Sequence, residues 1–520
     1  MENSRKSMKR FLIYITIAVS ALSLNSCKEF LEVEPIDKLT GNNFYKSEAD
    51  VQAAINDLSL KFFNKVTETH FIGAVGEYRA GEVLHDPEAE HSPEARAFVE
   101  VLGKNRLLEL LDGGKPWMRD NVVNYHFERI IDWRAYYQIV QGAGIIIAKL
   151  NEGVPGISEA MKSQYIGEAT FARCLAYFFM VRLYGDVPYY TDPYHVEPLP
   201  RESMVSVMNK CIEDLKSKKD GMVWSHGDPA FKGVRATRGS AIALLMNMNM
   251  WNAGFDRGNA TKYYRATADL GAELIKSNAY SLLPLEQWAN VIKGRSDESL
   301  FELFRTINYS ESVNQLAPTA DLFLHYPYKR PFFRWEKSMT YYRAGYMMKL
   351  YPDGVTDRRK ELWYENIFAN NGDFMMLKYA QNSFINNEES TNPDNTFLIF
   401  RYAESILLRA EALAELGEDD EAIKMLNLVR TRAQASQYAG GGGAVLKDFI
   451  FMERSRELMG EGHHFFDLVR TRRILSATWT YNPLTLDQFN RGGWTWPISA
   501  NALRNNPFMV LNSYWLNGGI

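Results

Sequence analysis

Cysteine is scarce in this sequence, with three cysteines in 520 residues. Cys174 and Cys211 both fall within helical patterns and form neither a metal-ligand cluster nor a disulfide framework, so we expect them to lie in the core. The sequence also lacks a His-Glu-x-x-His motif, a Gly-x-Ser-x-Gly elbow, a phosphate-binding glycine loop and a Rossmann fingerprint. We therefore expect no catalytic residue, no metal and no cofactor.

A strong excess of one charge is missing as well. The net charge is −4 and the isoelectric point is near 6.2. A chain that binds nucleic acid usually carries a basic field, and this composition provides none. Nucleic-acid partners are therefore not expected, whereas a hydrophobic content of 46% is ample for a large core.

The uncharged apolar run near the N-terminus is short. It covers residues 11–24 and follows the basic stretch from Lys6 to Arg10. A membrane-spanning helix needs about 20 apolar residues, so this layout indicates a cleaved secretory signal instead. The run ends in Leu-Asn-Ser-Cys, which resembles the box cleaved by bacterial lipoprotein signal peptidase. We predict a signal peptide at 1–26 and a mature chain, 27–520, that is lipidated on Cys27.

Apolar residues recur at helical spacing through most of the remaining chain. Helix pairs that bury an apolar face only when stacked on a neighbour are typical of repeat arrays. The sequence thus predicts a mainly α protein: a tetratricopeptide-like array of about four helix pairs with long irregular loops. The expected pairs are Phe400 to Leu416 with Glu421 to Gln434, Trp133 to Leu150 with a helix beginning near Ser158, Thr237 to Trp251 with Lys262 to Lys276, and the helix ending at Tyr184 with Val205 to Leu215.

Long stretches without periodicity separate these helices. Connections longer than about 15 residues in a compact protein are usually functional or disordered. Two of the stretches are rich in aromatic residues, and we expect the functional site there. The stretches are Gly81 to Val122, Thr306 to Met339, Tyr364 to Thr396 and Tyr438 to Val445.

Several segments resemble the SusD/RagB family, outer-membrane lipoproteins that work with TonB-dependent SusC-type transporters in Bacteroidetes. The acidic residues after Cys27 also resemble the surface-export tag of Bacteroidetes lipoproteins. The segments that carry the resemblance are Phe30, Leu31, Pro35, Thr40 and Phe44; Ala169 to Pro188; Arg401 to Glu404 with Ala410 to Ala412; Asn427 to Arg432; Glu453 to Leu458 with Glu461 to Arg470; Trp496 to Ile498; and Asn506 with Pro507.

The resemblance implies a SusD-like fold with an N-terminal part, 27–235, and a C-terminal part, 236–520. It implies a lipid-anchored protein on the exterior of the outer membrane that captures an oligosaccharide or polysaccharide. The protein would deliver this ligand to a SusC-like TonB-dependent transporter, and it would not be an enzyme. Two alternatives stay open: a RagB-like receptor for peptide or protein on the same fold, and an outer-membrane glycoside hydrolase, which needs two carboxylates about 5 to 10 Å apart.

SusD-type proteins generally bind glycan through aromatic side chains on loops, because a sugar ring has an apolar C–H face that stacks on an aromatic ring. A few oriented polar groups then fix the hydroxyls. On the basis of their position in loops, the candidates are Tyr78, Trp117, Tyr309, Tyr326, Tyr328 and Trp335, with Arg79, Asp86, Arg119 and Asn314 as polar partners. Trp251 and Trp288 lie on helical faces, where packing is expected.

A dense alternation of charge occupies the segment from Glu453 to Arg470. Spacings of three and four residues place opposite charges on one helix face, so we interpret these residues as structural. His463 and His464 with Asp467 could suggest a metal site, but no third ligand cluster accompanies them. We expect no metal there.

Overall fold

The computed structural model of the chain describes residues 44–67, 73–89, 99–111, 127–306, 322–381, 383–385, 390–392, 395–504, 506–516 and 518. The predicted signal peptide and Cys27 lie outside these residues, and their assignment stays a prediction.

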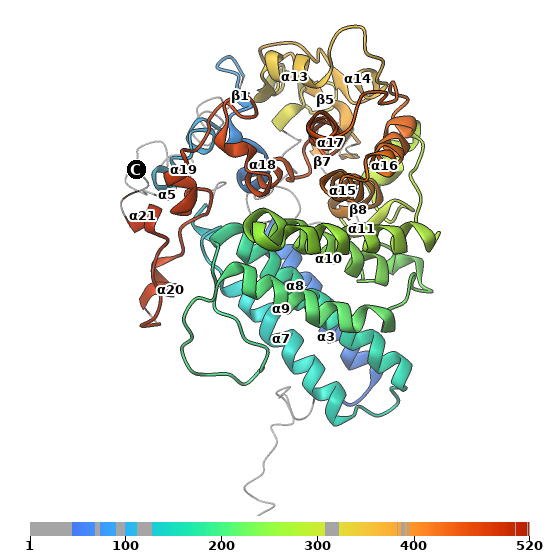
Figure 1. Cartoon of the computed structure of the whole chain (residues 1–520), viewed down its shortest axis with the longest axis vertical. Coiled ribbons are helices and arrows are strands. Elements are labelled where there is room, and N and C mark those ends of the chain that lie inside the picture. Colours follow the sequence, from blue (N-terminus) through green and yellow to red (C-terminus); the bar gives the residue numbers. More distant parts are fainter. Residues whose placement is uncertain are drawn as a thin grey trace, which may run out of the picture.

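Eight long helices pack one against the next in chain order, which confirms the mainly α helix-pair array (Figure 1). The array begins one helix earlier than the predicted pairs, with α3. A polypeptide segment from 277 to 401 separates α11 from α15, yet these two helices pack together. The helices are α3 (Glu48–Thr67), α7 (Arg134–Glu152), α8 (Glu159–Tyr184), α9 (Met204–Lys218), α10 (Arg238–Phe255), α11 (Ala260–Lys276), α15 (Tyr402–Glu415) and α16 (Asp419–Arg432).

Local sequence explains where several helices begin and end. The Ser158 side chain accepts a hydrogen bond from the Met161 amide at the start of α8, and Thr237 forms a capping box with Ser240 at the start of α10. Gly417, between α15 and α16, has a φ of +79°, a conformation that glycine adopts without strain. These signals set the boundaries of the predicted pairs.

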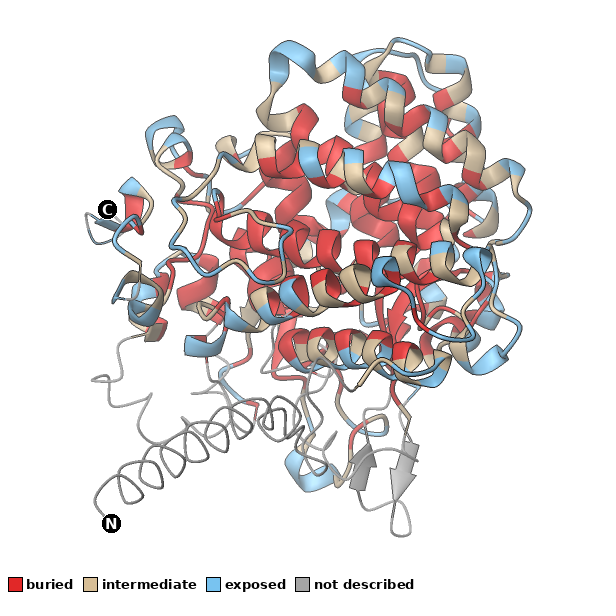
Figure 2. Ribbon diagram, turned by 90° about the horizontal axis from the view of Figure 1, so that it is seen from below, coloured by how far each residue is buried: buried red, intermediate tan, exposed pale blue. Residues whose placement is uncertain are grey.

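The centre of the molecule is formed by α8 and α10. Nearly every residue from Gly167 to Tyr184 is buried, and α10 is buried along most of its length (Figure 2). A helix that is apolar all round belongs inside a protein, with other helices covering it. Cys174 and Cys211 are both buried, and so are Trp251 and Trp288, as predicted.

Short antiparallel strand pairs hold the long connections. The stretches predicted to be irregular thus contain ordered ladders. Sequence periodicity missed them because each strand has few residues, and because the partners of β1 and β2 are far away along the chain. The pairs are β1 (Val83–His85) with β3 (Thr340–Tyr342), β2 (Ser299–Leu303) with β8 (Phe397–Arg401), β4 (Tyr364–Glu365) with β5 (Met375–Met376), and β6 (Ser383–Ile385) with β7 (Ser390–Asn392).

Further helices complete the fold around this array. They are α5 (Leu107–Leu111), α12 (Trp288–Lys293), α13 (Ala344–Leu350), α14 (Arg359–Leu362), α17 (Ala444–Glu457), α18 (His464–Arg470), α19 (Leu486–Asn490), α20 (Ala500–Arg504) and α21 (Ser513–Leu516).

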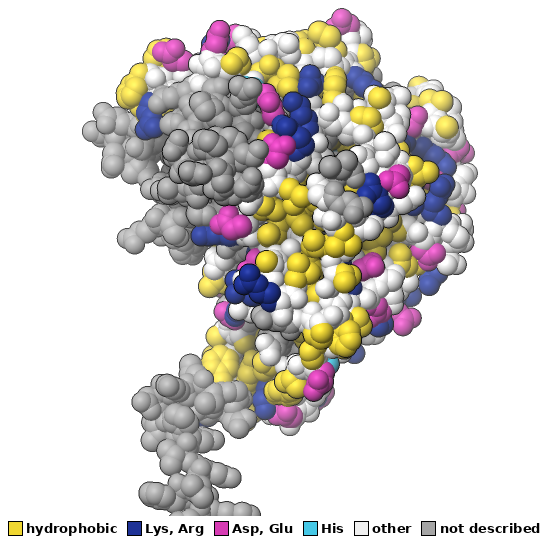
Figure 3. Space-filling model, turned by 90° about the vertical axis from the view of Figure 1, so that its left-hand side faces the viewer, with side chains coloured by type: hydrophobic (Ala, Val, Ile, Leu, Met, Phe, Trp, Pro, Cys, Tyr) yellow, Lys and Arg dark blue, Asp and Glu magenta, His cyan; other side chains and the backbone are white. Residues whose placement is uncertain are grey.

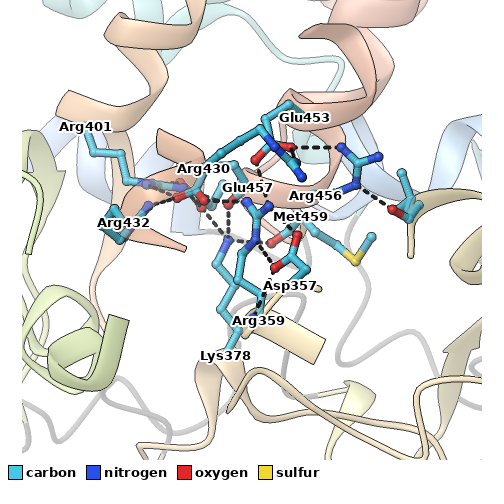
Figure 4. Close-up of polar contacts among 12 residues, drawn as sticks. Asp357, Arg359, Lys378, Arg401, Arg430, Arg432, Glu453, Arg456, Glu457 and Met459 are labelled. Atoms are coloured by element: carbon cyan, nitrogen blue, oxygen red, sulfur yellow. Dashed lines mark hydrogen bonds and ion pairs between the residues drawn. The ribbon is translucent and has the colours of Figure 1, made fainter. Parts of the chain in front are cut away.

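A buried ionic network joins α17 to the segment inserted before α15 (Figure 4). The Arg359 guanidinium lies 2.7 Å from carboxylate oxygens of Asp357 and Glu453 and 2.8 Å from Glu457. Burial alone would raise the pKa of Glu453, but Arg359 and the neighbouring Arg456 and Arg430 outweigh it and lower that pKa to about 2.

The structural interpretation of the charged segment agrees with this burial. The predicted contacts three residues apart are present between Glu453 and Arg456 and between Asp467 and Arg470, but further partners come from other parts of the chain. Arg401 from β8 pairs with Glu457 and Glu461, and Lys378 also pairs with Glu461.

Candidate functional site

Residues 325–337, here called the aromatic loop, project next to the β1–β3 ladder. The loop closes through a hydrogen bond from the Tyr326 amide to the Trp335 carbonyl, at 2.8 Å. Within it, the amides of Tyr328 and Lys329 both donate to the His325 carbonyl. Strand β3 follows directly, so the sheet fixes the place where the loop leaves the body of the protein.

Three aromatic side chains of this loop are exposed. Phe333 is 75% exposed, Phe332 55% and Tyr326 43%. The rings of Tyr326 and Phe332 meet edge to face with centroids 5.3 Å apart. Solvent-exposed apolar clusters of this kind commonly mark binding surfaces, because leaving such rings in water is unfavourable.

Trp335 belongs to the same loop and is only partly accessible. Its ring packs against the core, and the Lys329 ammonium sits 3.5 Å from the ring centroid. A cation at this distance is attracted by the electrons of the ring face. Trp335 and Lys329 therefore form the base of the aromatic loop, and Tyr328 is half-buried beside them.

Asp86 braces the aromatic loop from below. Its carboxylate accepts hydrogen bonds from the amides of Glu88 and Gly372, and its own amide donates to the Met339 carbonyl at 2.9 Å. The Ser338 amide in turn donates to the Gly372 carbonyl at 2.8 Å. Asp86 thus holds together three segments that are distant in the sequence.

Three of the predicted ligand contacts are internal. Tyr78 is 0% exposed, Arg79 2% and Asp86 1%. Arg79 donates to the Trp494 carbonyl at 2.7 Å and stacks on Phe465, and burial lowers its pKa to about 9. Their burial argues against direct ligand contact, so we correct these three assignments to packing and positioning roles.

The remaining candidates divide into two groups. Tyr326, Tyr328 and Trp335 are brought together in the aromatic loop. Trp117, Arg119, Tyr309 and Asn314 lie outside the described residues, and their role stays a prediction.

Sequence reasoning missed the two most exposed rings of the aromatic loop, Phe332 and Phe333. They were not among the candidates, although Arg-Pro-Phe-Phe-Arg-Trp offers a visible signal. Proline and arginine around two adjacent phenylalanines disfavour burial of both rings, because neighbouring charged side chains stay in water.

The paired histidines have structural surroundings. His463 is buried, and this burial lowers its pKa to about 3. His464 lies 3.4 Å from the Glu82 carboxylate; burial alone would lower the His464 pKa, but Glu82 raises it above the usual value. Within the described part of the chain, no group of three or more His, Cys, Asp or Glu residues is arranged to hold a metal ion.

A stacked helix-pair array with a braced, exposed aromatic loop defines a helical-repeat scaffold. Comparison with known proteins gives the family. The SusD family model matches residues 294–515, and a second model, described as starch-binding associating with outer membrane, matches residues 29–246.

Relatives cover nearly the whole chain. A SusD homolog of known structure from Bacteroides thetaiotaomicron is 35% identical, with a TM-score of 0.80 over 90% of this chain and 98% of that chain. SusD-like protein P38 of Formosa agariphila is 24% identical over 98% of this chain and 99% of the relative. The chain belongs to the SusD family.

A more distant structure shares the fold. A laminarin binding SusD-like protein is 19% identical, with a TM-score of 0.65 over 90% of this chain and 99% of that chain. The family descriptions indicate binding proteins that associate with the outer membrane. Among the helices described, none is long and apolar enough to cross a membrane.

Proposed function

We propose that the protein captures an oligosaccharide on the aromatic loop at the cell surface and delivers it to a SusC-like TonB-dependent transporter. The observation that carries this proposal is the exposed cluster of Tyr326, Phe332 and Phe333. Membership of the SusD family supports it, and so does a structural neighbour that binds laminarin. The proposed role is binding without bond cleavage.

The chemistry of the loop suits a sugar. The C–H face of a pyranose ring can cover an aromatic ring and remove both from water, while its hydroxyls stay hydrated at the edge. The perpendicular rings of Tyr326 and Phe332 offer two such surfaces at an angle. A bent oligosaccharide fits two surfaces at an angle better than a flat oligosaccharide does.

Affinity electrophoresis of the mature chain in gels containing plant, host or microbial polysaccharides tests capture. We expect retardation by one glycan class without released reducing ends. Replacing Phe333 and Phe332 by alanine should weaken retention roughly tenfold or more, equivalent to about 1.4 kcal/mol.

Tyr194→Ala is a matched control, because Tyr194 is 59% exposed, similar to Phe332 at 55%, and belongs to the segment between α8 and α9. Equal retention of the wild-type chain and the double loop variant would overturn the site. Retention of peptides instead of glycans would favour the RagB-like alternative, and released reducing ends would favour a hydrolase.

Anchoring and delivery need separate tests. Cys27→Ala should abolish incorporation of labelled fatty acid and release the protein from membranes. Extraction of the wild-type lipoprotein from outer membranes in mild detergent should recover a β-barrel transporter with it. Recovery of the lipoprotein alone would count against the delivery step.

A further inference from the structure

A cavity lies away from the aromatic loop. It is lined by the start of α7, the α8–α9 connection (residues 185–203) and the C-terminal segment. Its volume is about 460 Å³, within the range of about 300 to 1,000 Å³ that is typical of small-ligand sites. In Figure 1, α20 and the α8–α9 connection lie at the lower left, whereas β1 and α13 lie at the top.

One wall of the cavity is aromatic. Trp133, Tyr137 and Tyr190 line it. The rings of Tyr137 and Tyr190 are parallel to within 10°, with centroids 5.8 Å apart, and Trp133 meets Tyr137 edge to face at 5.6 Å. Rings in fixed contact with one another form a firm apolar surface for a ligand.

Polar groups of the C-terminal segment also line the cavity. Ser499 and Asn501 present a hydroxyl and an amide there, and Asn501 is exposed. The face that carries α20 and α21 is drawn in Figure 3, where apolar side chains gather around its middle. A ligand in the cavity thus has both aromatic rings and hydrogen-bonding groups within reach.

Hydrogen bonds fix the two walls relative to each other. The Arg201 guanidinium donates to the carbonyls of Asp186 and Val510, at 2.6 and 2.8 Å, so that it links the α8–α9 connection to the C-terminal segment. The Asn506 amide donates to the Leu199 carbonyl at 2.8 Å, and the Tyr137 hydroxyl donates to the Pro188 carbonyl at 2.8 Å. Because the cavity exists before binding, few protein groups have to become ordered when a ligand enters, and the entropic cost of binding is small.

The charged residues that line the cavity indicate which class of ligand it binds. Arg134 and Glu197 have opposite signs, and Arg134 is already bound to Asp132. A ligand with a net charge therefore gains little binding free energy in this cavity. A lining that combines aromatic rings with a hydroxyl and an amide matches the apolar faces and hydroxyl edges of a sugar ring.

We infer that this cavity is a second binding site, for a short uncharged oligosaccharide, separate from the aromatic loop. It does not depend on the loop proposal, and either site can fail alone. A protein with two such sites can hold two parts of one long glycan, which raises the local concentration of the second part once the first is bound.

Methionine-methyl NMR on the full mature protein tests the inference, because one methionine lies at each site. Met509 lines the cavity, and Met339 adjoins the aromatic loop through the hydrogen bond of its carbonyl with the Asp86 amide. Maltotriose, laminaritriose, cellotriose and xylotriose are titrated separately, with resonances assigned by Met509→Leu and Met339→Leu. We expect at least one sugar to shift the Met509 resonance in a saturable manner.

Three variants give the readout its specificity. Tyr190→Ala should weaken the Met509 titration at least fivefold, and Asn501→Ala, at an exposed position that does not put folding at risk, about fivefold. Tyr194→Ala removes an exposed tyrosine of the same connection that does not line the cavity, and it should change nothing.

The outcomes separate the two sites. A saturable Met509 shift that is weakened by Tyr190→Ala and Asn501→Ala but kept in the Phe332→Ala, Phe333→Ala double variant supports the second site. No Met509 shift with any of the four sugars, or the same shift in all variants, overturns it. The Met339 resonance reports independently on the aromatic loop.

Discussion

Gly372 is a residue whose lack of a side chain shapes the candidate site. A Cβ atom added there would come within 2.4 Å of an Asp86 carboxylate oxygen and 2.6 Å of the Ser338 carbonyl oxygen. Atoms cannot approach so closely, so one of the two braces beneath the aromatic loop would have to move. The positions of the exposed rings thus depend on Gly372, a residue outside the aromatic loop.

We therefore expect Gly372→Ala to weaken glycan retention roughly tenfold and to destabilise the fold by about 1 to 3 kcal/mol, because overpacking displaces the loop. Affinity electrophoresis and urea denaturation measure the two effects. Gly227→Ala is the control, because a Cβ atom there meets nothing within 4 Å. Equal retention by the two variants would contradict the bracing role.

Glu404 makes stability depend on pH. It is fully buried, and burial, only partly opposed by Arg454, raises its pKa from 4.5 to about 7. Because the folded-state pKa is the higher one, this carboxyl stabilises the fold below about pH 4.5, and that contribution is lost as the pH rises through about 7.

Glu404→Gln removes this loss. The variant should gain stability relative to wild type between about pH 5 and pH 8, by up to about 3 kcal/mol, since each pKa unit corresponds to about 1.4 kcal/mol. Urea denaturation at both pH values measures the difference, with the exposed Glu361→Gln as control. If wild type and Glu404→Gln differed in the free energy of unfolding by the same amount at both pH values, the prediction would be wrong.

At the scale of elements, the ionic network attaches the inserted segment to α17. Arg359 is completely buried and neutralises carboxylates from two parts of the chain. Breaking a buried ion pair typically costs about 3 to 5 kcal/mol, because the remaining charge stays in the interior. An exposed pair contributes about 1 kcal/mol or less.

Arg359→Met should therefore lower the free energy of unfolding by about 3 to 5 kcal/mol, and Arg358→Met by less than about 1 kcal/mol. The neighbouring Arg358 is 48% exposed and pairs only at the surface, with Glu361 at 3.5 Å. Urea denaturation of both variants distinguishes the two environments. A loss of similar size in both would rule out the network as the attachment of this segment.

Element boundaries could be predicted where the sequence carries a local signal. Ser158 and Gly417 marked helix ends correctly because caps and turns depend on neighbouring residues. Helix α3 was missed, although Val51, Ile55, Leu58 and Phe62 have helical spacing and are buried.

Strand pairing and side-chain exposure could not be predicted in the same way. Strand β1 pairs with β3, which lies in the other half of the chain, and neither strand has enough residues to show alternation. For the same reason the sequence placed Tyr78 at the surface and overlooked Phe333. Whether an aromatic ring in a long connection is covered depends on distant segments, which local patterns do not report.

At the scale of the whole molecule, the predicted division between residues 235 and 236 falls inside the stack. Helix α9 packs on α10 across it, and Lys219, directly after α9, forms an ion pair with Glu273 of α11 at 2.8 Å. Each half alone would expose the apolar side of α8 or α10 to water.

We expect fragments 27–235 and 236–520, expressed separately, to lack a cooperative thermal transition, because each lacks its neighbour in the array. Circular dichroism melting of each fragment and of their mixture measures this. A sharp transition in either fragment alone would show that the division is a true domain boundary.

The hydrogen bond from Arg79 to the Trp494 carbonyl joins residues 415 positions apart. During synthesis Arg79 is made long before Trp494. Its hydrogen-bond acceptor, the Trp494 carbonyl, is therefore absent until most of the chain has been translated. The N-terminal half cannot complete its packing until the last segment is released, and contacts of such separation slow folding. The growing chain must therefore be kept from aggregating until its final residues have been made.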